Sequence, residues 1–179
     1  MQKRLLRWEF FGFLFVGAVG TLLHFVFDWT LASPLAAAFS AVNESTWEHM
    51  KLLFVPFFLF TTVQFVFFAE PLHNFFAVKA AALLVGLLAI PVVFYTLNGA
   101  FGKTPSWVNI TIFFLADALC FVTSRRLLTH GALRGGAWQI AGFVLLWLLA
   151  FAFVYFTYRP PQLLLFQDPV TFTYGFLGK

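Results

Sequence analysis

One short stretch carries most of the side chains in this chain that could do chemistry. Residues 43–51 read Asn-Glu-Ser-Thr-Trp-Glu-His-Met-Lys, which places two carboxylates, a hydroxyl, an imidazole and an ammonium close together. His24 and Asp28 form a second polar pair earlier in the chain. Imidazole and carboxylate groups bind divalent transition metals such as Zn, and a metal with an open position activates water. These residue types therefore indicate a metal site with hydrolytic chemistry.

Helical spacing predicts which of these groups meet. Residues four apart lie on one face of a helix. If a helix begins near Asn43, Glu44 and Glu48 share one face. A helix that ends after His24 and Asp28, followed by one that returns from residue 43, would place both polar sets at the same end of a bundle.

The chemistry of each group suggests its role. As metal ligands we expect His24, Asp28 and His49. As catalytic groups we expect Glu48 as the general base, together with Glu44 and Ser45. Side chains that could bind a substrate are Asn43, Trp47, Lys51, Asp168 and Tyr174.

Part of the stretch also has a structural explanation. Ser45 and Glu48 have the S-x-x-E spacing of a capping box, in which both side chains satisfy backbone donors at a helix start. Lys51 can extend its ammonium to a membrane interface. The spacing matches no standard zinc motif such as H-E-x-x-H. A haem between His24 and His49 is geometrically conceivable, but the chain has no haem attachment motif.

A second polar set lies deeper in the apolar segments. Lys79 and Asp117 have matching depths, which predicts an intramembrane ion pair with Gln64 as a neighbour. The functional alternative is a proton or ion path. The polar side chains that flank the link between the third and fourth segments are typical of an aromatic belt and are also placed to rim the site: Tyr95, Asn98, Trp107 and Asn109.

Composition defines the class of protein. Of the 179 residues, 61% are hydrophobic and 10% are charged, whereas a soluble domain is about a quarter charged. The net charge of +4 does not indicate nucleic acid, because the basic residues gather at segment ends. With one cysteine, Cys120, the chain has neither a disulfide framework nor a thiolate metal site.

Five apolar segments are each close to the roughly 20 residues that span a bilayer as a helix. They cover residues 10–30, 46–69, 73–98, 107–125 and 136–157. Continuous apolar runs without alternation predict helices rather than strands. We therefore expect an all-α, multi-pass transmembrane bundle of five spans, with residues 1–179 forming a single domain.

Basic residues predict the orientation in the cell membrane. They lie before the first segment and between the fourth and fifth, which places both regions on the cytoplasmic side: Lys3, Arg4, Arg7, Arg125, Arg126 and Arg134. The polar stretch and residues 159–179 then lie outside. We expect this tail to pack on the outer face as an interfacial lid over the site.

Three stretches resemble a known family. Residues 43–49 read N-E-S-T-W-E-H, and together with 23–29 and 165–175 they resemble small prokaryotic membrane proteins of unknown function marked by an N-E-S-x-W-E-H motif. The resemblance implies that these residues match marked positions: His24, Asp28, Asn43, Glu44, Ser45, Trp47, Glu48, His49 and Lys51. It also implies that the tail belongs to the domain, with Phe172 standing where that family has glycine.

Three functions remain open on the sequence. The first is a metal-assisted hydrolase or transferase that acts on a lipid or another amphiphile in contact with membrane lipid. The second is a component that binds or transports a small molecule or ion with the same polar cluster. The third is a structural or assembly partner, in which the polar stretch only caps and fixes a helix.

Overall fold

The computed structural model describes residues 2–69 and 72–176, and within them every regular element is a helix. Five are long: α1 (Gln2–Trp29), α3 (Thr46–Phe68), α4 (Phe75–Phe101), α5 (Ser106–His130) and α6 (Gly136–Tyr158). Each is long and apolar enough to cross a membrane. The short helices are α2 (Pro34–Ala37) and the 3-10 helix η1 (Leu164–Phe166). The prediction of an all-α bundle with five spans is confirmed.

Two long helices extend beyond their apolar runs. α1 begins at Gln2 rather than at residue 10, and α5 continues to His130 rather than ending at residue 125. Polar residues continue a helix as readily as apolar ones, so an apolar run does not mark its end. Gly131 terminates α5 because its φ of 65° places it in the left-handed conformation that closes many helices.

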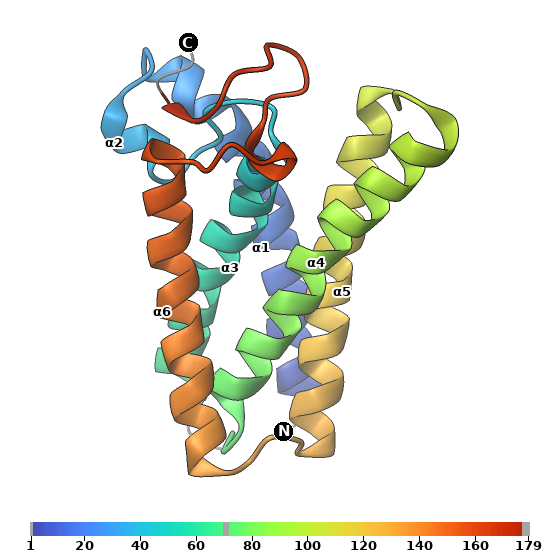
Figure 1. Cartoon of the computed structure of the whole chain (residues 1–179). Helices are drawn as coiled ribbons and strands as arrows, with labels where there is room; N and C mark the ends of the chain where they lie inside the picture. Colours follow the sequence, from blue (N-terminus) through green and yellow to red (C-terminus); the bar gives the residue numbers. More distant parts are fainter. Residues whose placement is uncertain (1, 70–71, 177–179) are drawn as a thin grey trace.

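The helices pack so that α3 and α4 occupy the centre. α1 packs against α3 and α5, while α4 packs against α3, α5 and α6. Phe54, Phe57 and Leu83 from the two central helices are buried in the core. Figure 1 shows the upper parts of α4 and α5 leaning away from the other helices.

The two ends of the bundle differ. α1 begins at one end, which we call the amino-terminal end, and the 159–176 tail lies at the other, the tail end (Figure 1). At the tail end, Phe27, Ala37 and Val42 form a small apolar cluster with Tyr158 and Phe176. The tail packs on this end of the bundle through Phe176, while residues 177–179 lie outside the described part of the chain. That this end is the outer face remains a prediction.

The tail contains one strained position. Phe172 has a φ of 60°, in the left-handed region that favours glycine. Its side chain is 70% exposed, so packing does not compensate for the strain. Glycine, the residue that the family resemblance led us to expect here, would adopt this φ without strain.

Candidate functional site

The polar stretch lies at the start of α3, where Ser45 is the N-cap. Its Oγ accepts a hydrogen bond from the Glu48 N–H at 3.3 Å, and its own N–H donates to Asn43 Oδ1 at 2.9 Å. Ser45 has an extended backbone, so the helix begins at Thr46 rather than near Asn43. Glu44 therefore lies before the helix and does not share a helical face with Glu48.

Glu48 lies in the interior of the bundle, 2% exposed. Its carboxylate contacts Lys51 Nζ at 2.5 Å and accepts hydrogen bonds from the Val42 N–H and the Thr157 hydroxyl, both at 3.1 Å. A carboxylate with these partners has little capacity left to accept a proton from a reacting group. The structure thus gives Glu48 a structural position rather than that of the predicted general base.

Lys51 is equally well satisfied. Besides the contact with Glu48, its Nζ donates to the Ala37 carbonyl at 2.8 Å and to Thr157 Oγ1 at 2.7 Å. An ammonium has three donors, and all three are used. Lys51 therefore ties α3 to α2 and α6 and does not extend to an interface or toward a substrate. We call these residues the Glu48–Lys51–Thr157 cluster.

A different set of side chains has open bonding capacity. His24, Glu44 and His49 each offer one ligand atom, and these atoms lie within 4.8 Å of one another. Glu44 Oε1 is 3.8 Å from His24 Nε2, and Glu44 Oε2 is 3.6 Å from His49 Nε2. Of the three predicted ligands, the structure brings His24 and His49 together, with Glu44 in the place expected for Asp28. Asp28 is exposed and is not a member of this group.

The His24–Glu44–His49 group offers three ligand atoms that are close enough together to hold a metal ion. Ligands about 2.1 Å from a tetrahedral metal are about 3.4 Å apart, slightly less than the two distances from the Glu44 oxygens to the imidazole nitrogens. His49 Nδ1 lies 3.0 Å from the Ser45 carbonyl. A proton on Nδ1 donates to that carbonyl and leaves Nε2 as a free lone pair, which is the usual support of a metal-binding histidine.

The tail holds Glu44 in place through Asp168. The Asp168 carboxylate accepts from the Glu44 N–H at 3.4 Å and from the N–H groups of Val170 and Thr171 at 2.7 and 3.2 Å. Burial raises the pKa of Asp168, but these backbone donors outweigh it, so the pKa lies below its ordinary value. Asp168 therefore acts on the site through the position of Glu44, rather than by the substrate contact that we expected.

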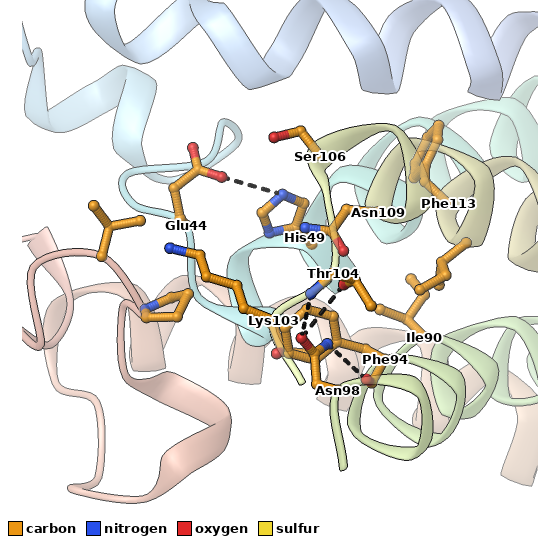
Figure 2. Close-up of a pocket in the computed structure, with 14 residues that line it drawn as sticks. Glu44, His49, Ile90, Phe94, Asn98, Lys103, Thr104, Ser106, Asn109 and Phe113 are labelled. Carbon is orange, nitrogen blue, oxygen red and sulfur yellow. Dashed lines mark hydrogen bonds and ion pairs between the residues drawn. The ribbon is translucent and has the colours of Figure 1, made fainter. Parts of the chain in front are cut away.

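Two pockets meet at the His24–Glu44–His49 group. The polar pocket, of about 260 Å³, is lined by Glu44 and His49 and by polar groups of α4, α5 and their link. The apolar pocket, of about 540 Å³, is lined by all three members of the group and by exposed apolar side chains such as Phe25 and Ile110. Figure 2 shows the side chains around the polar pocket.

Several lining residues come from the link between α4 and α5. The sequence placed Asn98 and Asn109 near the rim, and both line the polar pocket, whereas Lys103, Thr104 and Ser106 were not anticipated. Asn98 Oδ1 accepts from the Thr104 N–H at 3.0 Å, which fixes the start of this link (Figure 2). The buried Oδ1 of Asn109 accepts no hydrogen bond from the described residues. Asn109 lines both pockets, so this unused acceptor lies next to the space that a ligand would fill.

The remaining predicted substrate-binding residues have structural positions. Trp47 packs against Phe153 and Phe166, with ring centroids 4.4 and 4.7 Å apart. Asn43 is buried and donates to the Gly175 carbonyl at 3.5 Å. Tyr174 pairs with Gln167 in an isolated bridge of the tail. None of these three is among the residues that line the two pockets.

Lys79 forms an intramembrane ion pair, but its acidic partner is Glu9 and not Asp117 as predicted. Lys79 Nζ bonds Glu9 Oε1 at 2.8 Å, and Gln64 Nε2 donates to the same oxygen at 2.9 Å. Glu9 lies before residue 10, where the first span was predicted to begin. For that reason Glu9 was not predicted as a partner of Lys79. The oxygens of Asp117 are buried and accept no hydrogen bond from any residue that the structure describes.

The comparisons with known proteins identify a family. Its model, described as "Family of unknown function (DUF6512)", matches residues 1–176. The chain belongs to this family, which confirms the expectation of an uncharacterised family and includes the described tail in the match. No curated protein and no solved structure matches the chain.

Proposed function

We propose that the chain is a metal-dependent membrane enzyme. It spans the cell membrane and hydrolyses, or transfers a group from, an amphiphilic substrate. The chain's membership of a family of unknown function does not itself assign an activity. The observation that carries this proposal is the meeting of His24, Glu44 and His49 within 4.8 Å at the junction of two pockets.

The ligand set favours a divalent transition metal. Two imidazoles and one carboxylate suit Zn, Mn or Fe, and three protein ligands leave a position open for water or substrate. A metal held by these three residues would lower the pKa of a bound water to about 7 and would polarise a carbonyl or phosphoryl oxygen. The partial exposure of Glu44, at 47% of its side chain, keeps the site accessible.

Glu44 has two parts to play in this proposal. One carboxylate oxygen would hold the metal, and the other would accept a proton from the attacking water. In hydrolysis, the water oxygen bonds to the ester carbon or phosphorus while the bond to the leaving oxygen breaks. One water proton passes through Glu44 to that leaving oxygen, and the other stays on the acid product.

The two pockets suggest how an amphiphile would lie. Its polar head fits the polar pocket, where Lys103 supplies a positive charge and Asn109 an unused acceptor. Its apolar part fits the apolar pocket, whose wall includes Phe25 and Ile110. Because both side chains are exposed on the outside of the bundle, a lipid can enter from the bilayer.

The charge distribution supports an outward-facing site. Arg125 and Arg126 near the end of α5 lie at the same end of the bundle as the basic start of α1 (Figure 1). By the positive-inside rule this amino-terminal end is cytoplasmic and the tail end is outside. A cysteine introduced at Thr173 should then react with an impermeant reagent on intact cells, and one at Thr129 should not. The reverse labelling would overturn the orientation.

Metal analysis tests the ligand set. The purified protein should contain about one Zn, Mn or Fe per chain, and the single variants His24→Ala, Glu44→Gln and His49→Ala should lose it. His73→Ala is the matched control, because His73 is exposed and lies two residues before α4, which starts at the opposite end of the bundle (Figure 1). No metal in the parent protein, or metal that survives His49→Ala, would sink the assignment.

A separate assay tests the chemistry. The metal-loaded protein in nanodiscs is incubated with carboxylic and phosphoric ester lipids, and the products are measured by mass spectrometry. We expect a released acid that is absent with Glu44→Gln and present with His73→Ala. Stoichiometric metal without any product would instead support the binding or transport alternative.

A further inference from the structure

A third pocket lies at the amino-terminal end, away from the His24–Glu44–His49 group. It has a volume of about 610 Å³ and lies between α1 and α5. Its lining combines exposed basic side chains, Arg125 and Arg126, with apolar ones and with the buried Glu9. We call it the basic pocket. Its lining includes no member of the His24–Glu44–His49 group, so a ligand here is independent of the proposed metal site.

Glu9 leaves one strong acceptor unused at this pocket. Its Oε1 accepts from Lys79 and Gln64, while its Oε2 is buried and accepts no hydrogen bond among the residues described. The side chain is only 3% exposed. A carboxylate oxygen away from water costs free energy unless a donor reaches it. Because Glu9 lines the pocket, a hydroxyl or ammonium group of a ligand is the kind of donor that this oxygen lacks.

The charges around the pocket favour an anion despite this carboxylate. The Lys79 ammonium lies 2.8 Å from Glu9 Oε1 and balances its negative charge. The net positive charge at the pocket therefore comes from Arg125 and Arg126. Arg125 and Arg126 are exposed near the end of α5. Arginine pairs well with phosphate because its planar donors match two phosphate oxygens.

The rest of the wall is apolar and faces outward. Leu6, Phe10 and Val122 line the pocket and are 44, 56 and 46% exposed. These side chains lie on the outer surface of two helices that are long enough to span a membrane. Such a wall can pack against an acyl chain.

We propose that the basic pocket binds a phospholipid whose headgroup carries a hydrogen-bond donor. The phosphodiester lies at Arg125 and Arg126, a headgroup hydroxyl or ammonium donates to Glu9 Oε2, and an acyl chain lies along Leu6, Phe10 and Val122. Both phosphatidylglycerol and phosphatidylethanolamine have this chemistry. Phosphatidylcholine lacks the donor, because its nitrogen is fully methylated.

The lipid preference can be measured by native mass spectrometry of the full chain with each of the three lipids. We expect the glycerol or the ethanolamine lipid, or both, to be retained about five-fold better than the choline lipid, which is the effect of one hydrogen bond. The two donor-bearing lipids, measured separately, distinguish a hydroxyl from an ammonium donor. Equal retention of all three lipids would overturn the proposal.

Variants locate the binding. The double variant Arg125→Gln/Arg126→Gln should lower the retention of the phospholipid about 30-fold, because each basic residue near an anionic headgroup contributes roughly a factor of five. The control Arg134→Gln, also a basic residue of this end but outside the pocket, should have no effect. Unchanged retention in the double variant, or an equal loss in the control, would contradict the site.

Glu9→Gln tests the donor. It keeps an oxygen for Lys79 but replaces the free acceptor, so the preference of the donor-bearing lipids over phosphatidylcholine should disappear. A preference that persists in this variant would contradict the role of Oε2. If the variant fails to fold, the lipid series on the parent protein and the arginine variants still decide the proposal.

Discussion

Glu44 and Glu48 lie four positions apart in one motif, yet their surroundings have opposite character. Glu48 is 2% exposed, and its carboxylate meets an ammonium, a backbone N–H and a hydroxyl. The Glu44 side chain is 47% exposed, and its carboxylate has two imidazoles at 3.6 and 3.8 Å, beyond hydrogen-bond distance. One group has its partners inside the protein, and the other has room for a ligand.

The difference teaches that a carboxylate in a motif indicates chemistry only if its bonding capacity is open. A buried charge must be paired and hydrogen-bonded, so Glu48 requires Lys51 and Thr157. A group at a pocket needs no such partners, since water or a ligand satisfies it. Substitutions at the two positions should therefore affect different properties, and the free energy of unfolding is the common scale on which they can be compared.

Lys51→Met should have the largest effect. It leaves the buried Glu48 carboxylate without its counter-charge, and breaking a buried pair in this way costs about 3–5 kcal/mol. Thermal unfolding in detergent measures the loss. In the double variant Lys51→Met/Glu48→Gln the unpaired charge is gone, so part of the stability should return. Equal unfolding of the single and double variants would show that the charges are not coupled.

Asp168→Asn should have an intermediate effect of about 2 kcal/mol, because hydrogen bonds to a charged group are lost. The pKa of Asp168 is lower in the folded protein than the usual value near 4. Its stabilising contribution is therefore complete above about pH 4 and is lost as the pH falls through the folded-state pKa. Unfolding measured from pH 7 to pH 3 should show the parent approaching the variant at low pH. A constant gap would contradict this origin.

Phe172→Gly should stabilise the protein by up to about 1 kcal/mol, since glycine adopts a positive φ without strain. The exposed phenylalanine loses little packing. The matched control is Val170→Gly, at another exposed tail position but without a positive φ, which should destabilise. Thermal unfolding in detergent compares the two variants. Destabilisation by both substitutions would argue against strain at Phe172.

Glu44→Gln should have the smallest effect on metal-free protein, within about 1 kcal/mol, because partly exposed ion pairs contribute little. Its effect on metal affinity should be large, at least about 100-fold, since even supporting residues of metal sites cost 10–100-fold. Metal titration and unfolding of the same sample separate these properties. A large loss of stability in metal-free Glu44→Gln would show that Glu44, like Glu48, is important for the stability of the fold.

The sequence located the site better than it assigned the roles within it. The expected antiparallel order of the first two long helices correctly placed His24 and His49 near one another. The end of one helix and the start of the next lie at the same end of the bundle. Helical spacing failed for Asp28, which lies on an exposed part of α1. Glu9 was also missed as the partner of Lys79, because the charged first turns of α1 were not predicted to be helical.

What the sequence alone determined is the class of fold, since the length and apolarity of the segments leave helices as the only spanning structure. It also indicated Ser45 as the N-cap of α3, because that contact is local, between residues three positions apart. The other half of the expected capping box is not formed, since the Ser45 N–H donates to Asn43.

The tertiary structure alone decided which polar groups are satisfied. Lys51 meets Thr157 across 106 positions, and Asp168 reaches Glu44 across 124 positions. Local spacing contains no information about such partners, because they come from helices and a tail that only packing brings together. The same packing leaves Glu44 open beside His24 and His49.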